Sequence, residues 1–191
     1  MKRVIIIHGF HASPTGGWRP WLVQELQNKG IEAEALSMPS PDDPIFEEWL
    51  ETIQKAVGEK YEDVCLVGHS LGVPAVLRFL EQVPEGKKIA GAVLVSGLYK
   101  PLRVEDTEGD IRKIDHFVDH PFDFEKIKSS CEKFVVIHGD NDDRVPFEHA
   151  EFLSGVLECK LIPIPNGGHL NGKSGCRELP SALESILEIA K

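Results

Sequence analysis

The pattern of hydrophobic and polar residues divides the chain into short apolar runs and longer segments of helical spacing. The short runs predict strands over residues 4–7, 31–36, 64–67, 89–95, 134–137 and 161–164. Apolar residues three and four positions apart, together with capping residues, predict helices over residues 18–29, 44–57, 71–82, 124–130, 146–153 and 179–190. Glycine and proline residues fall between these elements, as expected for turns and loops.

Strands and helices alternate along the whole chain, with no internal repeat and no linker. Right-handed crossovers between such strands produce a parallel sheet with helices on both faces. We therefore predict an α/β fold with a mostly parallel six-stranded sheet in the order 2-1-3-4-5-6, in a single domain over residues 1–191. This order reverses between strands 1 and 3, and ligands bind at the carboxyl ends of strands beside such a reversal.

Two segments have less regular patterns. Asp43 and Pro44 are typical of the N-cap and the first position of a helix, and this helix would direct Ile45 toward the core. Residues 99–122 are rich in Asp and Glu, contain two prolines and lack periodicity. They predict an irregular excursion over the sheet, too short for a separate lid domain.

Charge and cysteine content narrow the classes of partner. The formal net charge is −10, with no basic block, which argues against nucleic acid or an anionic membrane as a partner. No apolar run is long enough for a signal peptide or a membrane span. The four cysteines are scattered without a C-x-x-C pair, so we expect reduced thiols and a cytoplasmic protein.

The sequence Gly68-His69-Ser70-Leu71-Gly72 lies between a predicted strand and a predicted helix. G-x-S-x-G at this place is the pattern of a nucleophile elbow, a tight turn that presents the serine hydroxyl above the carboxyl end of the sheet. The two glycines allow the helix to pass close to the strand, and the helix directs its positive end toward Ser70. A glycine-rich turn without chemistry has the same pattern, so a base and an acid are needed as well.

A serine nucleophile requires a histidine base and an acid that orients the histidine. His169 follows the last predicted strand and two glycines, which allow its loop to reach over the sheet. The loop after the preceding strand offers three carboxylates, Asp140, Asp142 and Asp143. We choose Asp142, because it comes three residues after the glycine that ends the strand, and the order Ser70, Asp142, His169 is that of α/β-hydrolases.

The tetrahedral intermediate of acyl transfer needs hydrogen-bond donors for its oxyanion. The backbone N–H groups of Leu71, directly after Ser70, and of Phe10, in the loop after the first strand, are the expected donors. His11 lies in the same loop and is a candidate for the substrate pocket. Trp18 is a second pocket candidate, with a role in the core as the alternative.

Besides the elbow, several stretches that match a known protein family run nearly from end to end of the chain. They are His8-Gly9-Phe10, Ala12-Ser13-Pro14, Trp18 with Trp21-Leu22, Met38-Pro39, Glu47-Glu48-Trp49-Leu50, Pro74-Ala75, Val95-Ser96-Gly97, Asp142-Asp143 with Val145-Pro146-Phe147, and Gly167-Gly168-His169. With the elbow, they resemble the α/β-hydrolase superfamily, and within it the small lidless serine hydrolases typified by retinoblastoma-binding protein nine and its bacterial relatives. The resemblance implies a Ser-Asp-His hydrolase with carboxylesterase-like activity. The retinoblastoma-binding motif L-x-C-x-E is not matched, because residues 157–161 end in leucine, so no protein partner is predicted.

His116, His120, His138 and the glycine-rich loops are interpreted as structural. His116 and His120 are four residues apart, a spacing that can hold a metal, but no third ligand is evident. His138 is interpreted as a structural residue at the end of a strand. The glycine-rich loops do not form a phosphate-binding motif. We therefore expect no metal and no cofactor.

The sequence predicts a serine hydrolase that cleaves small acyl esters through Ser70, Asp142 and His169 and an acyl-enzyme. Its partner is a small-molecule acyl ester. The alternative is a binding protein on a hydrolase scaffold with negligible turnover, since one fold supports many functions.

Overall fold

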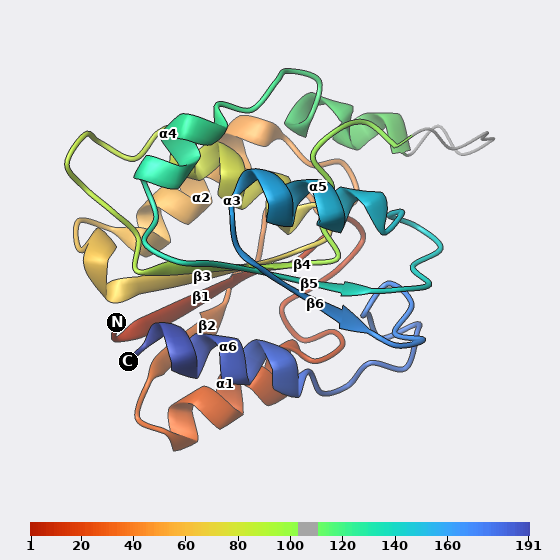
Figure 1. Cartoon of the computed structure of the whole chain (residues 1–191), viewed down its shortest axis with the longest axis horizontal. Helices are drawn as coiled ribbons and strands as arrows, with labels where there is room; N and C mark the ends of the chain where they lie inside the picture. Colours follow the sequence, from red (N-terminus) through yellow and green to blue (C-terminus); the bar gives the residue numbers. More distant parts are fainter. Residues whose placement is uncertain (103–110) are drawn as a thin grey trace.

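The apolar runs form one parallel sheet in the computed structural model, which describes residues 1–102 and 111–191 (Figure 1). Within these residues, six strands pair in the order β2-β1-β3-β4-β5-β6, and every neighbouring pair is parallel. The strands are β1 (Arg3–Ile7), β2 (Glu32–Ala35), β3 (Val64–His69), β4 (Gly91–Val95), β5 (Phe134–Gly139) and β6 (Lys160–Ile164). The predicted fold class and strand order are confirmed.

Helices cover both faces of the sheet. Figure 1 shows α1 (Arg19–Asn28) and α6 (Pro180–Ile189) on one face. The other face carries α2 (Phe46–Val57), α3 (Gly72–Glu81), α4 (Phe124–Ser129) and α5 (Glu148–Val156). Two short 3-10 helices, η1 (Tyr61–Asp63) and η2 (Ile111–Phe117), complete the described elements. All of the predicted strands and helices are present, with ends displaced by a few residues.

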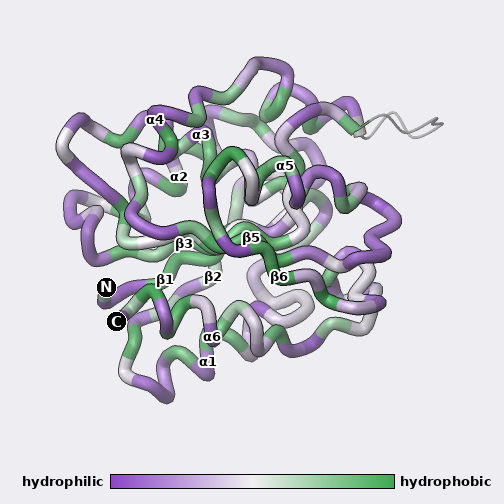
Figure 2. The backbone as a smooth tube through the Cα atoms, viewed as in Figure 1, coloured by the Kyte–Doolittle hydropathy of each residue, from purple (hydrophilic) through white to green (hydrophobic). Residues whose placement is uncertain are grey.

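Alternate residues of each central strand enter two separate cores. In β3, Leu66 packs under α2 to α5, whereas Val67 packs against α1 and α6. The same alternation holds for Ile5 and Ile6 in β1. Figure 2 shows the hydrophobic residues concentrated along the strands between the two helical layers. Continuous apolar runs are therefore required, because both faces of these strands are buried.

The predicted start of α2 is wrong. The helix begins at Phe46, with Ile45 in an extended conformation at the N-cap position, and not at Pro44 after an Asp43 cap. The Asp43 amide instead donates to Ser40 O in a preceding turn. Ile45 is 46% exposed, so it does not point into the core as predicted. Local capping preference was overridden by the turn that brings the chain from β2.

The excursion over residues 99–122 is more regular than predicted. Residues 103–110 lie outside the described residues, but η2 follows them, so the prediction of an irregular segment is wrong there. Phe117 is fully buried in the core. The Arg78 guanidinium on α3 donates to Phe117 O at 3.2 Å and to Pro121 O at 3.3 Å. These bonds hold the later part of the excursion against the helix that follows the elbow.

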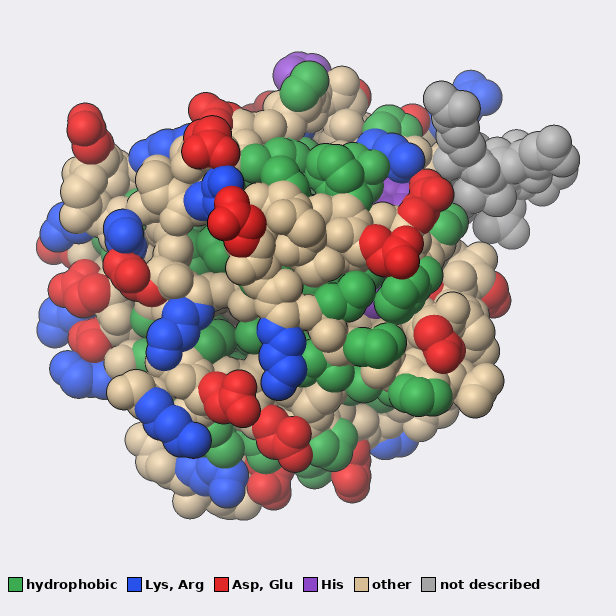
Figure 3. All heavy atoms as spheres, viewed as in Figure 1, with side chains coloured by type: hydrophobic (Ala, Val, Ile, Leu, Met, Phe, Trp, Pro, Cys, Tyr) green, Lys and Arg blue, Asp and Glu red, His purple; other side chains and the backbone are tan. Residues whose placement is uncertain are grey.

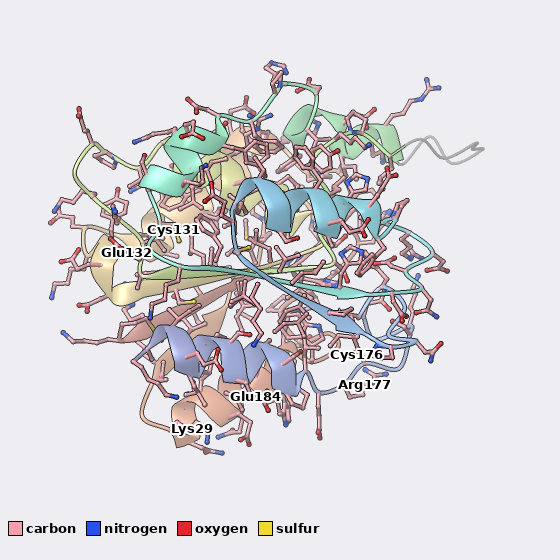
Figure 4. The ribbon with its side chains drawn as sticks, viewed as in Figure 1. Lys29, Cys131, Glu132, Cys176, Arg177 and Glu184 are labelled. Carbon is pink, nitrogen blue, oxygen red and sulfur yellow. The ribbon has the colours of Figure 1, made fainter. Side chains whose placement is uncertain are left out.

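The distribution of surface charge and the state of the cysteine thiols can be compared with the sequence. Acidic and basic side chains are interspersed on the face that Figure 3 shows. All four cysteines are free, and Figure 4 shows Cys131 and Cys176 in different parts of the molecule. Cys65 is buried in β3, and burial raises its thiol pKa to about 12. In the described ranges, no helix combines the length and the apolar character that crossing a bilayer requires.

Candidate active site

Ser70 lies at the tip of the turn between β3 and α3, with a backbone φ of 55°. A non-glycine residue adopts this left-handed conformation only where the surrounding structure enforces it. A Cβ on Gly68 would lie 2.6 Å from Gly72 O, and a Cβ on Gly72 would overlap Ile7 O, so both positions require glycine. The Ser70 amide donates to Val95 O at 2.9 Å. Strands β1, β3 and β4 together therefore fix the turn.

The structure brings Ser70, His169 and Asp142 together in one line of hydrogen bonds. Ser70 Oγ lies 3.0 Å from His169 Nε2, and His169 Nδ1 lies 2.8 Å from Asp142 Oδ2. The carboxylate only accepts, so His169 carries its proton on Nδ1 and presents Nε2 to the serine hydroxyl. This is the arrangement in which an imidazole can remove the proton of a serine.

Asp142 is fully covered and fully hydrogen-bonded. Its Oδ1 accepts the backbone amides of Arg144 at 2.9 Å and Val145 at 3.0 Å. Burial raises the pKa of Asp142, but hydrogen bonds from His138 and His169, the charge of His169 and the Val145 amide together hold that pKa well below its usual range. The carboxylate is therefore ionised at neutral pH, as required to stabilise a charged imidazole.

The neighbours of Asp142 have different positions. The exposed Asp140 accepts the Asn166 amide at 2.8 Å, and Asn141 accepts the Gly168 amide at 2.8 Å. Asp143 is exposed. These contacts tie the loop after β5 to the loop after β6. Of the three carboxylates that the sequence offered, only Asp142 contacts His169.

Two buried side chains hold the backbone around His169. His69 Nε2 lies 3.0 Å from His169 O, and Trp18 Nε1 donates to Leu170 O at 2.8 Å. Burial, with the charges of His169 and Arg19, lowers the pKa of His69 well below its ordinary value. His69 is therefore neutral, with its proton on Nε2 for the carbonyl to accept.

Trp18 does not line a pocket. Its side chain is fully buried, and its ring meets His69 edge-on at 5.8 Å between centroids. Of the two roles considered for Trp18, the structure favours the role in the core. Its contact with Leu170 makes it a support for the loop that carries His169.

The expected oxyanion donors flank Ser70. Within the part of the chain that the structure describes, the amides of Phe10 and Leu71 form no hydrogen bond. Gly9 is packed so close that an added Cβ would lie 2.8 Å from Ser70 Cβ, which places the loop after β1 against the elbow. His8 fixes this loop: its Nδ1 lies 2.8 Å from Gly9 O, and its Nε2 accepts the Met38 amide at 3.3 Å.

His11 lies at the surface of the same loop, and its role in a substrate pocket stays a prediction. Its side chain is 46% exposed, and its Nδ1 lies 2.6 Å from Asp42 Oδ1. Its amide donates to Pro41 O, so the loops after β1 and β2 are joined at this point. No metal-holding group of three His, Cys, Asp or Glu side chains occurs among residues 1–102 and 111–191.

Sequence reasoning missed the contacts of His69 and His138. His69 belongs to the elbow motif, but its bond to a carbonyl 100 positions away has no local signal. His138 was assigned a structural role, whereas its Nε2 lies 3.3 Å from Asp142 Oδ2. The available signal was its position at the end of β5, where side chains point toward the loops that carry the site.

Comparison with known proteins identifies the family. The serine hydrolase family profile matches residues 4–188. The chain belongs to the serine hydrolase family. This serine hydrolase is 38% identical to YdeN of Bacillus subtilis over 179 residues, covering 94% of this chain and 91% of that protein. It is 24% identical to the serine hydrolase RBBP9 of Rattus norvegicus over 174 residues, covering 91% and 88%. The resemblance to this group is confirmed, and the protein is a hydrolase.

Solved structures support the same placement. This serine hydrolase superposes on the crystal structure of the Bacillus subtilis ydeN product with a TM-score of 0.91 and 35% identity, covering 99% of this chain and 98% of the other. Est1E from Butyrivibrio proteoclasticus matches with a TM-score of 0.74 and 18% identity, covering 100% and 89%. The second likeness concerns the fold alone.

Proposed function

We propose that this serine hydrolase cleaves small acyl esters, with Ser70 as the nucleophile, His169 as the base and Asp142 as the acid. The observation that carries the proposal is the unbroken line of hydrogen bonds from Ser70 through His169 to the buried Asp142. A binding protein has no chemical need for all three groups in this geometry.

The reaction follows from the positions of the protons. His169 Nε2 accepts the proton of Ser70 as its oxygen attacks the ester carbonyl, and Asp142 stabilises the charge that develops on the imidazole. The amides of Phe10 and Leu71 donate to the oxyanion of the tetrahedral intermediate. His169 then returns its proton to the leaving alcohol and afterwards activates the water that hydrolyses the acyl-enzyme.

Short acyl chains are the favoured substrates. The described part of the 99–122 excursion is held against α3 by Arg78, and Phe117 is part of the core. This segment therefore belongs to the body of the fold and does not stand above it as a separate cap. We infer that the site is shallow, which would favour acetyl and butyryl groups over long chains.

The test combines a fluorophosphonate probe with a series of p-nitrophenyl esters from acetyl to dodecanoyl. The wild-type protein should be labelled on Ser70, and kcat/KM should be highest for the short esters. Ser70→Ala should lose both labelling and hydrolysis with an unchanged circular dichroism spectrum, because no other residue occupies the elbow.

Three results would count against the proposal or against a part of it. Labelling retained in the Ser70→Ala variant would place the nucleophile elsewhere. A wild-type protein that is neither labelled nor active on any ester would favour the alternative of a binding protein on a hydrolase scaffold. Rates that rise steadily to dodecanoyl would leave Ser70 in place but refute the preference for small acyl groups.

A further inference from the structure

A second histidine lies against the carboxylate of Asp142. His138 is the last residue but one of β5, is completely buried, and places its Nε2 3.3 Å from Asp142 Oδ2, the oxygen that also contacts His169 Nδ1. The same Nε2 lies 2.9 Å from Val145 O. Both neighbours of Nε2 are acceptors, so this nitrogen carries the proton and donates it between them.

The Nε2–H of His138 has two acceptors among the described residues, Val145 O at 2.9 Å and Asp142 Oδ2 at 3.3 Å. Its Nδ1 has no hydrogen-bond partner in the described ranges, although it is buried. Its ring meets Phe147 edge-on at 5.8 Å between centroids, which fixes the plane of the imidazole. A buried polar nitrogen without a partner is unfavourable. A leucine at position 138 would avoid the burial of an unpaired nitrogen. The contacts of the other ring nitrogen, Nε2, therefore have to offset the cost of burying Nδ1.

Geometry at Asp142 indicates what that role is. Oδ1 is held by two backbone amides, whereas the contacts of Oδ2 in the described part of the chain come from the side chains of His169 and His138. His169 must exchange a proton with Ser70 and carry charge during the reaction. It therefore cannot also hold Oδ2 in one position throughout the reaction. His138 remains in place throughout, because it is packed at the strand end.

We propose that His138 is a positioning residue for the hydrolysis: its Nε2–H holds Asp142 Oδ2 at the point where this oxygen accepts the Nδ1 proton of His169. The inference rests on the proposed function, since it concerns the acid of that reaction. It assigns His138 a task beyond support of the strand end.

Three substitutions separate positioning from packing. His138→Met keeps much of the volume but has no donor. His138→Gln places an amide nitrogen near the former Nε2, whereas His138→Asn places one near the former Nδ1, in the wrong position. Each variant is quantified by probe titration of intact sites, so that loss of folded protein does not enter kcat. The resonance of the His169 Nδ1 proton, downfield of the amide region when it is strongly hydrogen-bonded, is recorded by ¹H NMR.

We expect kcat per labelled site to fall about 10- to 100-fold in His138→Met and His138→Asn, the range that follows from losing a hydrogen bond to a charged group. KM should change little, and the His169 resonance should shift or disappear. His138→Gln should restore the resonance and most of kcat, because its donor is in the right place.

Equal losses in the three variants, or wild-type kcat and an unshifted resonance in His138→Met, would refute the positioning role. Failure of the proposed function would look different. In that case the wild-type protein would lack Ser70-dependent hydrolysis, while the His169 resonance would still report whether His138 orders Asp142.

Discussion

The two sides of Ser70 are built in different ways. On one side, the loops after β5 and β6 carry Asp142 and His169, whose side chains are 0% and 7% exposed. On the other side, the loops after β1 and β2 meet through His11 and Asp42, whose side chains are 46% and 77% exposed. The first pair of loops meets through the covered hydrogen bond between Asp142 and His169, and the second pair meets through the exposed contact between His11 and Asp42.

This difference assigns separate tasks to the two sides. Buried hydrogen bonds to a charged group keep a fixed geometry, which proton transfer requires. An exposed side-chain contact contributes little free energy. We therefore expect the acid–base side, meaning the loops after β5 and β6, to determine the rate of the chemical step. The loops after β1 and β2 should affect the choice of substrate.

The largest expected effect is the loss of the carboxylate charge at Asp142. Asp142→Asn should lower kcat by about 10⁴-fold, the loss seen when the triad aspartate of a serine protease is replaced by asparagine. Asp140→Asn and Asp143→Asn are the matched controls, because both residues are exposed members of the same loop. Steady-state kinetics on a short ester measures all three. A severe loss in Asp143→Asn with a nearly silent Asp142→Asn would reverse the assignment.

Acid should destabilise the folded chain through a buried histidine on α5, His149. Burial and the charge of Lys100 lower the pKa of His149 to about 4 from 6.5. Below pH 6.5 His149 binds a proton in the unfolded chain, whereas in the folded chain it binds one only near pH 4. The free energy of unfolding therefore falls as the pH falls from 6.5 to 4. The free energy of unfolding should decrease by up to about 3 kcal/mol from this group.

Urea unfolding at pH 7.5 and pH 4.5 measures this loss. His149 Nδ1 accepts the Tyr99 amide at 3.3 Å, and His149→Asn offers an oxygen near the same position without a titrating group. The variant should therefore lose less stability between the two pH values than the wild-type protein. His8 and His69 also have lowered pKa values, so part of the acid sensitivity should remain. An unchanged pH dependence in the variant would exclude His149 as a source.

A comparison of two tryptophans tests the contrast between the two sides directly. Trp18 Nε1 donates to Leu170 O beside His169, and Trp49 Nε1 donates to Pro39 O in the loop after β2, each at 2.8 Å. Both side chains are fully buried. Trp18→Phe and Trp49→Phe should each lower the free energy of unfolding by roughly 1 to 2 kcal/mol. Only Trp18→Phe should also lower kcat, by several-fold; equal kinetic effects would erase the difference proposed here.

The smallest expected effect concerns the exposed contact between His11 and Asp42. Asp42→Asn should change the free energy of unfolding by less than about 1 kcal/mol, since exposed pairs contribute little. Its kcat on a short ester should remain near the wild-type value. Its KM should differ from the wild-type KM by an amount that depends on the alcohol group of the ester. A large drop in kcat would show that the loop tip, and not its buried base at His8, positions the oxyanion donors.

The elements closest to Ser70 were predictable because their sequence signals are local. The apolar runs set the strands, and Gly68 and Gly72 are needed wherever a helix passes this close to a strand. The approach of His169 and Asp142 followed from strand order, because neighbouring parallel strands bring their carboxyl ends to one edge. For this reason, residues 27 positions apart could be paired before any distance was known.

The features that could not be predicted depend on tertiary contacts. The burial of Trp18 reflects a hydrogen bond to a carbonyl 152 positions away. Helix η2 follows a segment of poor periodicity, and its order comes from packing of Phe117 and from the Arg78 guanidinium. The start of α2 was decided by a turn at Ser40 and not by the apparent cap at Asp43. Local preferences are too weak to decide such cases.

The contact between Gly139 and Gly168 limits how the chain can vary. A side chain on Gly139 would overlap the carbonyl of Gly168, so the two loops touch backbone to backbone. The gap between them therefore has a fixed width, and it accommodates a carboxylate on one methylene group at position 142. A glutamate there would be too long unless the loops separated. The contact between the two glycines thus limits the length of the acidic side chain at position 142. An exchange of aspartate for glutamate would require changes at positions 139 and 142 together.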